Sequence, residues 1–126
     1  MDEPPLKILI ADDEPLATER LQLLLARSPG VDLVGTASDG EAAVRLAEGL
    51  APDVMLLDIA MPGMSGPELQ RELTRHGQAI PTIFITARAD QTVRQQLLEP
   101  GAVECLFKPF SEEQLRAALA AAFRRN

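Results

Sequence analysis

Five side chains that could take part in chemistry stand at or directly after the ends of short apolar runs. They are two adjacent aspartates, a third aspartate, a threonine and a lysine: Asp12, Asp13, Asp58, Thr86 and Lys108. In an open sheet of parallel strands, ligands bind beyond the carboxyl ends of the strands, so these side chains can share one site. Two carboxylates about 4 Å apart repel by about 4 kcal/mol at an effective dielectric near 20, so the cluster favours a proton or a bound cation.

These residue types suit a magnesium-assisted transfer of a phosphoryl group. Mg²⁺ prefers oxygen ligands, uses few carboxylates and leaves positions for water and phosphate, which fits Asp12 and Asp13. Lys108 and Thr86 would supply a cation and a hydroxyl to the phosphoryl oxygens. A carboxylate can attack phosphorus and form an acyl phosphate, and Asp58 is the preferred nucleophile because it ends the most apolar run before a turn. Glu14 is interpreted as a helix first-turn charge.

The segments that must position these residues alternate between apolar strands and amphipathic helices. The predicted strands are 6–11, 31–37, 53–58, 82–86 and 103–107, and the predicted helices follow Glu14, Asp39 and Ser65, span about 90–99, and follow Ser111. The run from Val54 to Leu57 is continuously apolar, as expected of a strand covered on both faces. Five strand–helix units in this order predict an α/β fold with a parallel sheet between two helix layers.

Several helix starts carry specific capping signals. Pro15 suits a first helical position, and Asp39 is a good N-cap residue. Capping boxes are predicted for the pairs Ser65–Glu68 and Ser111–Gln114. The last helix carries an apolar stripe that would face the sheet: Leu115, Ala118, Leu119, Ala122 and Phe123.

Length and composition narrow the class of protein. The chain has 126 residues, which predicts a single domain over 1–126 with a core at about 6–123. A net charge of −7 with neither Trp nor Tyr argues against nucleic-acid binding by this domain. The single Cys105 excludes an internal disulfide and a multi-cysteine zinc site. The absence of a long apolar run and an acidic N-terminus predict a cytoplasmic protein with no membrane partner.

Four segments, each at a predicted strand end, carry a resemblance to a known family. They are Ala-Asp-Asp-Glu at 11–14, Leu-Asp-Ile-Ala-Met-Pro-Gly-Met-Ser-Gly at 57–66, Ile-Thr-Ala at 85–87 and Phe-Lys-Pro-Phe at 107–110. The chain from about residue 6 to 123 resembles a response-regulator receiver domain of the CheY-like type. Its N-terminal part is similar to receivers joined to LytTR-type DNA-binding domains, and its C-terminal part to FixJ-type receivers.

The resemblance implies a (βα)₅ flavodoxin-like sheet with strand order 2-1-3-4-5 and helices on both faces. It implies that Asp58 is the phospho-acceptor and that Lys108 and Thr86 contact the phosphoryl oxygens. Mg²⁺ would be bound by Asp12, Asp13, Asp58 and the backbone carbonyl of Ala60. The bond between Lys108 and Pro109 is expected to be cis.

The function implied is that of a switch in two-component signalling. A histidine kinase or histidine phosphotransfer protein would donate its phosphoryl group to Asp58, and the phosphorylated domain would engage a downstream protein partner. The domain could form a homodimer when phosphorylated. Hydrolysis of the aspartyl phosphate would end the signal, so the protein is expected to be a phospho-acceptor and not a turnover enzyme.

Two alternatives remain, and one position departs from the family. A Mg²⁺-dependent phosphohydrolase with an aspartate nucleophile would need an aspartate two residues after Asp58, where Ala60 stands. A receiver fragment of a longer DNA-binding transcription regulator stays open. The position three before Lys108 is commonly Tyr or Phe in the family, and here it is Cys105. Because the usual ring is missing, weaker coupling of phosphorylation to the last strand is expected.

Overall fold

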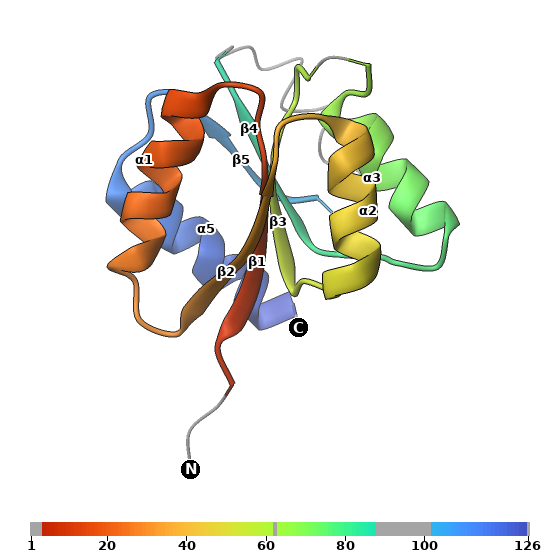
Figure 1. Ribbon diagram of the computed structural model, residues 1–126. Helices are drawn as coiled ribbons and strands as arrows, with labels where there is room; N and C mark the ends of the chain where they lie inside the picture. Colours follow the sequence, from red (N-terminus) through yellow and green to blue (C-terminus); the bar gives the residue numbers. More distant parts are fainter. Residues whose placement is uncertain (1–3, 62, 88–101, 126) are drawn as a thin grey trace.

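Five parallel strands form one sheet between two pairs of helices in the computed structural model, which describes residues 4–61, 63–87 and 102–125. The strands are β1 (Leu6–Ala11), β2 (Val31–Ala37), β3 (Val54–Asp58), β4 (Thr82–Thr86) and β5 (Ala102–Phe107). The helices are α1 (Pro15–Ala26), α2 (Gly40–Leu50), α3 (Gly66–Arg75) and α5 (Glu112–Arg125). Helices α1 and α5 cover one face of the sheet, and α2 and α3 cover the other (Figure 1).

The strand order is β2-β1-β3-β4-β5, and every pairing is parallel. The predicted flavodoxin-like architecture and order are therefore confirmed. The predicted helix at about 90–99 lies outside the described residues. Strand β3 begins at Val54, one residue later than predicted. Asp53, the residue before it, bonds to Lys7 of β1 through both its N–H and its carboxylate, each at 2.8 Å. Strand β5 begins one residue earlier than predicted, at Ala102.

The predicted capping signals are present at the helix starts. Asp39 accepts a hydrogen bond from the Ala42 N–H at 2.8 Å. Ser65 and Glu68 form a reciprocal capping box, with the Glu68 N–H donating to Ser65 Oγ at 3.2 Å. The same arrangement joins Ser111 and Gln114. Short-range sequence therefore fixes where these helices begin, and hence where the preceding loops must end.

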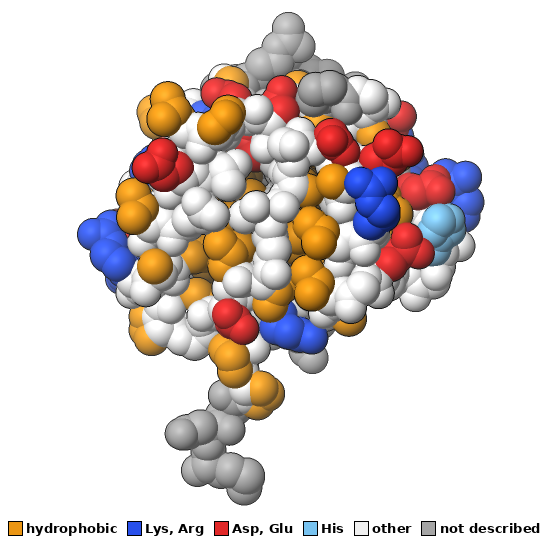
Figure 2. Space-filling model, in the orientation of Figure 1, with side chains coloured by type: hydrophobic (Ala, Val, Ile, Leu, Met, Phe, Trp, Pro, Cys, Tyr) orange, Lys and Arg blue, Asp and Glu red, His pale blue; other side chains and the backbone are white. Residues whose placement is uncertain are grey.

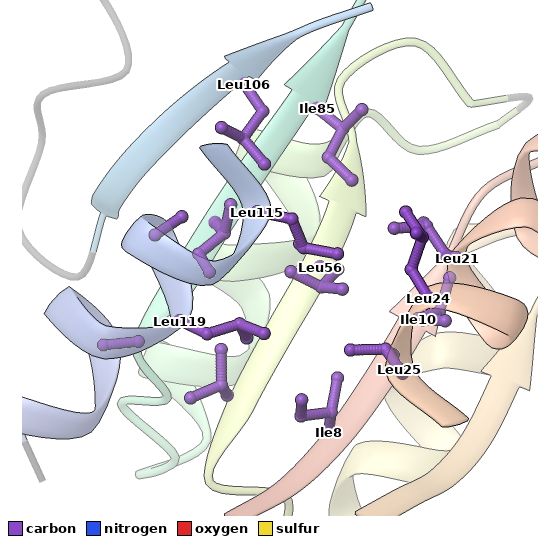
Figure 3. Packing of buried hydrophobic residues seen from close by; sticks show 14 of the residues in the cluster. Ile8, Ile10, Leu21, Leu24, Leu25, Leu56, Ile85, Leu106, Leu115 and Leu119 are labelled. Carbon is purple, nitrogen blue, oxygen red and sulfur yellow. The ribbon is translucent and has the colours of Figure 1, made fainter. Parts of the chain in front are cut away.

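Alternate residues of each strand feed two hydrophobic clusters, one on each face of the sheet. Figure 3 shows the cluster under α1 and α5, where strand residues such as Ile8 and Leu56 and helix residues such as Leu115 occupy the space between the helices and the sheet. All five residues of β3 and of β4 are buried, as predicted for central strands covered on both faces. The burial of these two strands on both faces fixes the positions of their last residues, Asp58 and Thr86.

One residue of the predicted apolar stripe on α5 is not in the core. Leu115, Ala118, Leu119 and Ala122 are buried, but the Phe123 side chain is 50% exposed. Phe123 lies near the C-terminal end of α5, where it borders a surface pocket with Pro4 and Leu6 instead of packing under the helix. No helix in the described ranges is long and apolar enough to cross a membrane.

Cys105 is buried on the α2–α3 face of the sheet. It is 8% exposed and pairs in register with Phe84 of β4, which is 1% exposed. The prediction that Cys105 is a small buried residue is confirmed.

Candidate functional site

The predicted side chains meet at the carboxyl edge of the sheet. Asp12 follows β1 directly, Asp58 and Thr86 are the last residues of β3 and β4, and Lys108 follows β5. Strand order reverses between β1 and β3, so the loops after these two strands diverge and leave a crevice. A pocket of about 560 Å³ opens there, lined by Asp13, Glu14, Asp58, Ile59, Ala60, Thr86, Ala87 and Lys108.

Carboxylates dominate one side of this pocket. Carboxylate oxygens of Asp12, Glu14 and Asp58 lie within 4.8 Å of one another. Asp12 and Asp58 are buried, at 3% and 6% exposure, whereas Asp13 and Glu14 are exposed at the mouth. Acidic side chains also outnumber basic ones along the upper edge of the molecule in Figure 2, which is the end at which β1 passes into α1 in Figure 1.

The tightest group of carboxylates differs from the predicted one. It contains Glu14 where the sequence had suggested Asp13, and Asp13 lines the pocket without joining the group. Glu14 is the N-cap residue of α1, but its side chain makes no capping hydrogen bond. Its interpretation as only a helix charge was wrong, because its carboxylate turns toward Lys108. The unbroken acidic run from Asp12 to Glu14 was the signal that could have included it.

Burial and crowding make Asp58 a weak acid in the metal-free protein. Burial, followed by the charge of Asp12, raises the pKa of Asp58 from 3.8 to about 7. The charge of Lys108 and the Ala60 N–H, 3.4 Å from Asp58 Oδ1, oppose this increase, and the Asp13 side chain adds to it. Asp58 is thus poised to exchange its proton for a cation near neutral pH.

Lys108 is the cation among these acids. Its Nζ donates hydrogen bonds to Asp12 Oδ2 at 3.1 Å and to Glu14 Oε1 at 2.9 Å. Burial lowers the pKa of Lys108, but hydrogen bonds to Glu14 and Asp12 more than offset this and leave the pKa raised, so the side chain stays charged. Its backbone N–H donates to the Thr86 carbonyl at 2.7 Å, which ties the ends of β4 and β5 together. The Lys108–Pro109 bond is cis, as expected.

The start of α3 approaches the strand that carries Asp58 very closely. The Gly66 N–H donates to the Ile59 carbonyl at 3.0 Å, and a Cβ added at Gly66 would lie 2.7 Å from the Asp58 backbone oxygen. Only glycine fits this contact without a shift of backbone. Gly66 closes the 57–66 segment that carries the family resemblance, but its position directly after the N-cap Ser65 does not reveal this contact.

The donor set fits a hard divalent cation. Three carboxylate oxygens already lie close together in an open pocket with space left for further oxygen ligands. Ala60 lines the pocket and directs its N–H toward Asp58, while its carbonyl as a ligand stays a prediction. The arrangement of acids, lysine and buried threonine is chemically suited to bind a phosphoryl group next to a metal.

Comparison with known proteins gives a consistent result. The family model for the response regulator receiver domain matches residues 8–120. The chain is 38% identical over 120 residues to the alkaline phosphatase synthesis transcriptional regulatory protein PhoP of Bacillus subtilis, covering 95% of this chain and 49% of PhoP. It is 36% identical over 107 residues to a protein-glutamate methylesterase/protein-glutamine glutaminase of Koribacter versatilis, covering 83% of this chain and 29% of that protein.

Solved structures agree with the sequence comparison. The fold is similar to a chain of the CheX–CheY–BeF₃–Mg²⁺ complex from Borrelia burgdorferi, with a TM-score of 0.87, 26% identity and coverage of 95% of this chain and 90% of that one. The chain spans about half the length, or less, of the curated relatives described above. With the family model matching most of its length, the chain belongs to the response regulator receiver domain family and has the phospho-acceptor signalling function of that family.

Proposed function

We propose that Asp58 is the residue that accepts the phosphoryl group. The observation that carries the proposal is the pocket at the strand ends, where Asp58 is buried beside Asp12 and shares the space with Lys108 and Thr86. Among the described carboxylates, Asp58 alone is both buried at a strand end and part of the pocket lining that includes Thr86 and Lys108. A phosphohydrolase is not favoured, because Ala60 stands where such an enzyme would need its second acid.

Mg²⁺ is the proposed metal. Asp12, Asp13, Asp58 and the Ala60 carbonyl would hold it, and Glu14 lies close enough to join through water. When bound, the ion neutralises charge on the phosphoryl group and on the carboxylates around it. The complex from Borrelia burgdorferi contains Mg²⁺ together with BeF₃, which supports the same choice for this chain.

The chain's own residues account for the transfer. A carboxylate oxygen of Asp58 attacks the phosphorus of a phosphohistidine, a P–O bond forms, and the P–N bond breaks with its electron pair leaving on the imidazole. The Lys108 ammonium and the Thr86 hydroxyl contact the phosphoryl oxygens and offset their charge. Attack of water on the aspartyl phosphate later releases inorganic phosphate and restores the carboxylate.

The partners proposed are a histidine kinase or histidine phosphotransfer protein as donor and a downstream protein as receiver of the signal. The two relatives described above share this region but differ in length and in name, one being a transcriptional regulator and the other a methylesterase. We therefore propose no specific downstream activity. That the chain is not a turnover enzyme, that it is cytoplasmic, and that phosphorylation promotes a homodimer all stay predictions.

The test is incubation with acetyl phosphate and Mg²⁺, followed by intact-mass measurement. We expect the mass of one added phosphoryl group in the wild type, and none with EDTA or in Asp58→Asn. Asp32→Asn, at an exposed residue of β2, is the matched control and should react like the wild type. An unmodified wild type under saturating donor and Mg²⁺, or full modification of Asp58→Asn, would refute the assignment.

A further inference from the structure

The loop that carries Lys108 is held from outside the pocket by Arg20, a residue of the second turn of α1. Arg20 Nη2 donates a hydrogen bond to the Phe110 backbone carbonyl at 2.6 Å. The same guanidinium lies over the Phe110 ring, 4.8 Å from its centroid. One planar side chain thereby contacts both the backbone and the ring of a residue two positions after Lys108.

These contacts complete a set of anchors around Lys108. On its N-terminal side, the Lys108 N–H is fixed to the Thr86 carbonyl at 2.7 Å. On its C-terminal side, the Phe110 ring is 5% exposed in the cluster under α1 and α5, and Arg20 holds the carbonyl of the same residue. Arg20, Lys108, Pro109 and Phe110 line one pocket of about 440 Å³ beside the acidic pocket.

Helix α1 also begins directly after the segment that contains the two residues contacted by the lysine ammonium. Asp12 and Glu14, which accept the hydrogen bonds of Lys108 Nζ, lead directly into α1. The segment with these two acceptors is therefore continuous with the helix whose Arg20 holds the backbone of the loop that carries Lys108. A shift of this loop against α1 would change the position of the ammonium relative to Asp58.

We propose that Arg20 is a positioning residue for phosphoryl transfer, acting through the place it gives to Lys108. The inference rests on the proposed roles of Asp58 and Lys108 and adds to them the reason why the lysine is already in place before the phosphoryl group arrives. Arg20 touches neither Asp58 nor the carboxylates of the proposed metal site in any described contact, so its effect on metal binding is expected to be small.

The test compares the rate of Asp58 phosphorylation by acetyl phosphate with the affinity for Mg²⁺ alone, measured by calorimetry. We expect Arg20→Ala to slow phosphorylation about tenfold, because small displacements of a catalytic group are costly, while the Mg²⁺ affinity stays within about twofold. Arg20→Lys keeps the charge but loses the planar guanidinium, so its phosphorylation rate should lie between those of the wild type and Arg20→Ala. Arg116→Ala, which removes an exposed arginine on α5, is the matched control and should leave both quantities unchanged.

A double-mutant cycle with Lys108→Ala separates positioning from a general effect of charge. In the Lys108→Ala background, Arg20→Ala should have no further effect on the rate. An equal slowing in both backgrounds would show that Arg20 acts through its own charge, and an equal loss of rate and Mg²⁺ affinity would show a merely structural role. Either result overturns the inference, as does an unchanged rate in Arg20→Ala. If the wild type itself is not phosphorylated, the proposed function fails instead.

Discussion

Asp12 and Asp58 stand directly at the ends of two neighbouring central strands, whereas Lys108 reaches the same pocket from the edge strand β5 through contacts with distant parts of the chain. We call Asp12, Asp13, Glu14 and Asp58 the carboxylate half of the site, and Lys108 to Phe110 the lysine half. In the carboxylate half, the two buried members, Asp12 and Asp58, are placed directly by the ends of β1 and β3. The lysine half depends on the Thr86 carbonyl, on Glu14 and on Arg20.

The two halves also differ in the sign of their contribution to stability. Burial, and after it the charge of Asp12, raises the pKa of Asp58, so the charged carboxylate half is unfavourable in the metal-free protein. Lys108 is the described cation that pairs with them, through Asp12 and Glu14. Several long-range contacts therefore hold Lys108 in place, and its charge offsets the charges of the clustered carboxylates. Substitutions in the two halves should change stability in opposite directions.

The largest effect on stability is expected from removing the cation. Lys108→Ala leaves the buried Asp12 carboxylate without its charged partner and removes the attraction that opposes the Asp58 charge. Loss of one partner of a buried pair costs about 3 kcal/mol, which urea unfolding at pH 8 without metal would measure. Lys7→Ala, at a half-buried lysine of β1, is a control for loss of a lysine outside the pocket. An unchanged stability would show that the carboxylate half does not need the lysine.

A smaller loss is expected from Gly66→Ala. The new Cβ would lie 2.7 Å from the Asp58 backbone oxygen and 3.3 Å from the Phe84 ring, so α3 or the end of β3 must move. Overpacking of this kind costs about 1–3 kcal/mol. Thermal unfolding and the rate of acetyl phosphate labelling should both fall, because the contact sets the place of Asp58. Gly49→Ala, with open space around the added Cβ, is the control and should lose neither stability nor labelling rate.

The metal-free protein should lose stability as the pH rises from about 4 to about 7. Asp58 has a folded-state pKa of about 7 against a reference value of 3.8, so over this interval the folded state binds more protons than the unfolded state. Stability therefore falls with increasing pH, and the contribution of the protonated form is gone above about pH 7. Asp58→Asn should flatten this part of the profile and be the more stable protein at pH 8, by about 1–2 kcal/mol. A wild-type profile parallel to that of Asp58→Asn would contradict the assignment of the raised pKa.

Addition of Mg²⁺ should stabilise the wild type more at pH 8 than at pH 5, because binding requires the charged carboxylates. Asp12→Ala and Asp13→Ala should each weaken the affinity about tenfold or more, and Glu14→Gln should change it only about twofold if its main partner is Lys108. Calorimetry can measure these Mg²⁺ affinities, since the chain has no Trp for fluorescence quenching. A tenfold loss of Mg²⁺ affinity in Glu14→Gln would show that Glu14 is a ligand of the metal and not mainly a partner of Lys108.

The smallest response is expected around Cys105. The side chain is buried against Phe84 and is too small to replace a ring that would bury about 150 Å² or more. NMR shifts on addition of beryllofluoride and Mg²⁺ should be large at 58–61 and 86–87 and small at 103–106. A large response centred on Cys105 would show that the missing ring does not weaken coupling to β5.

Local sequence was sufficient for much of the fold. The caps at Asp39, Ser65 and Ser111 and the continuously apolar β3 depend on neighbours a few residues away, so periodicity and capping rules predict them. Strand boundaries were off by one residue at β3 and β5, and Phe123 proved half exposed, because such details depend on what packs against a strand end or a last helical turn.

The sequence by itself determined which acids, which lysine and which hydroxyl end the strands, and hence the chemistry available at one edge of the sheet. Tertiary structure alone decided how they are paired. Glu14 joins Lys108 across 94 positions of the chain, Arg20 holds Phe110 across 90, and Gly66 meets the Asp58 carbonyl from the start of another element. The physical reason is that a strand end is set by local hydrophobic patterning, whereas hydrogen bonds and close approaches between separate loops exist only after the strands have taken their order in the sheet.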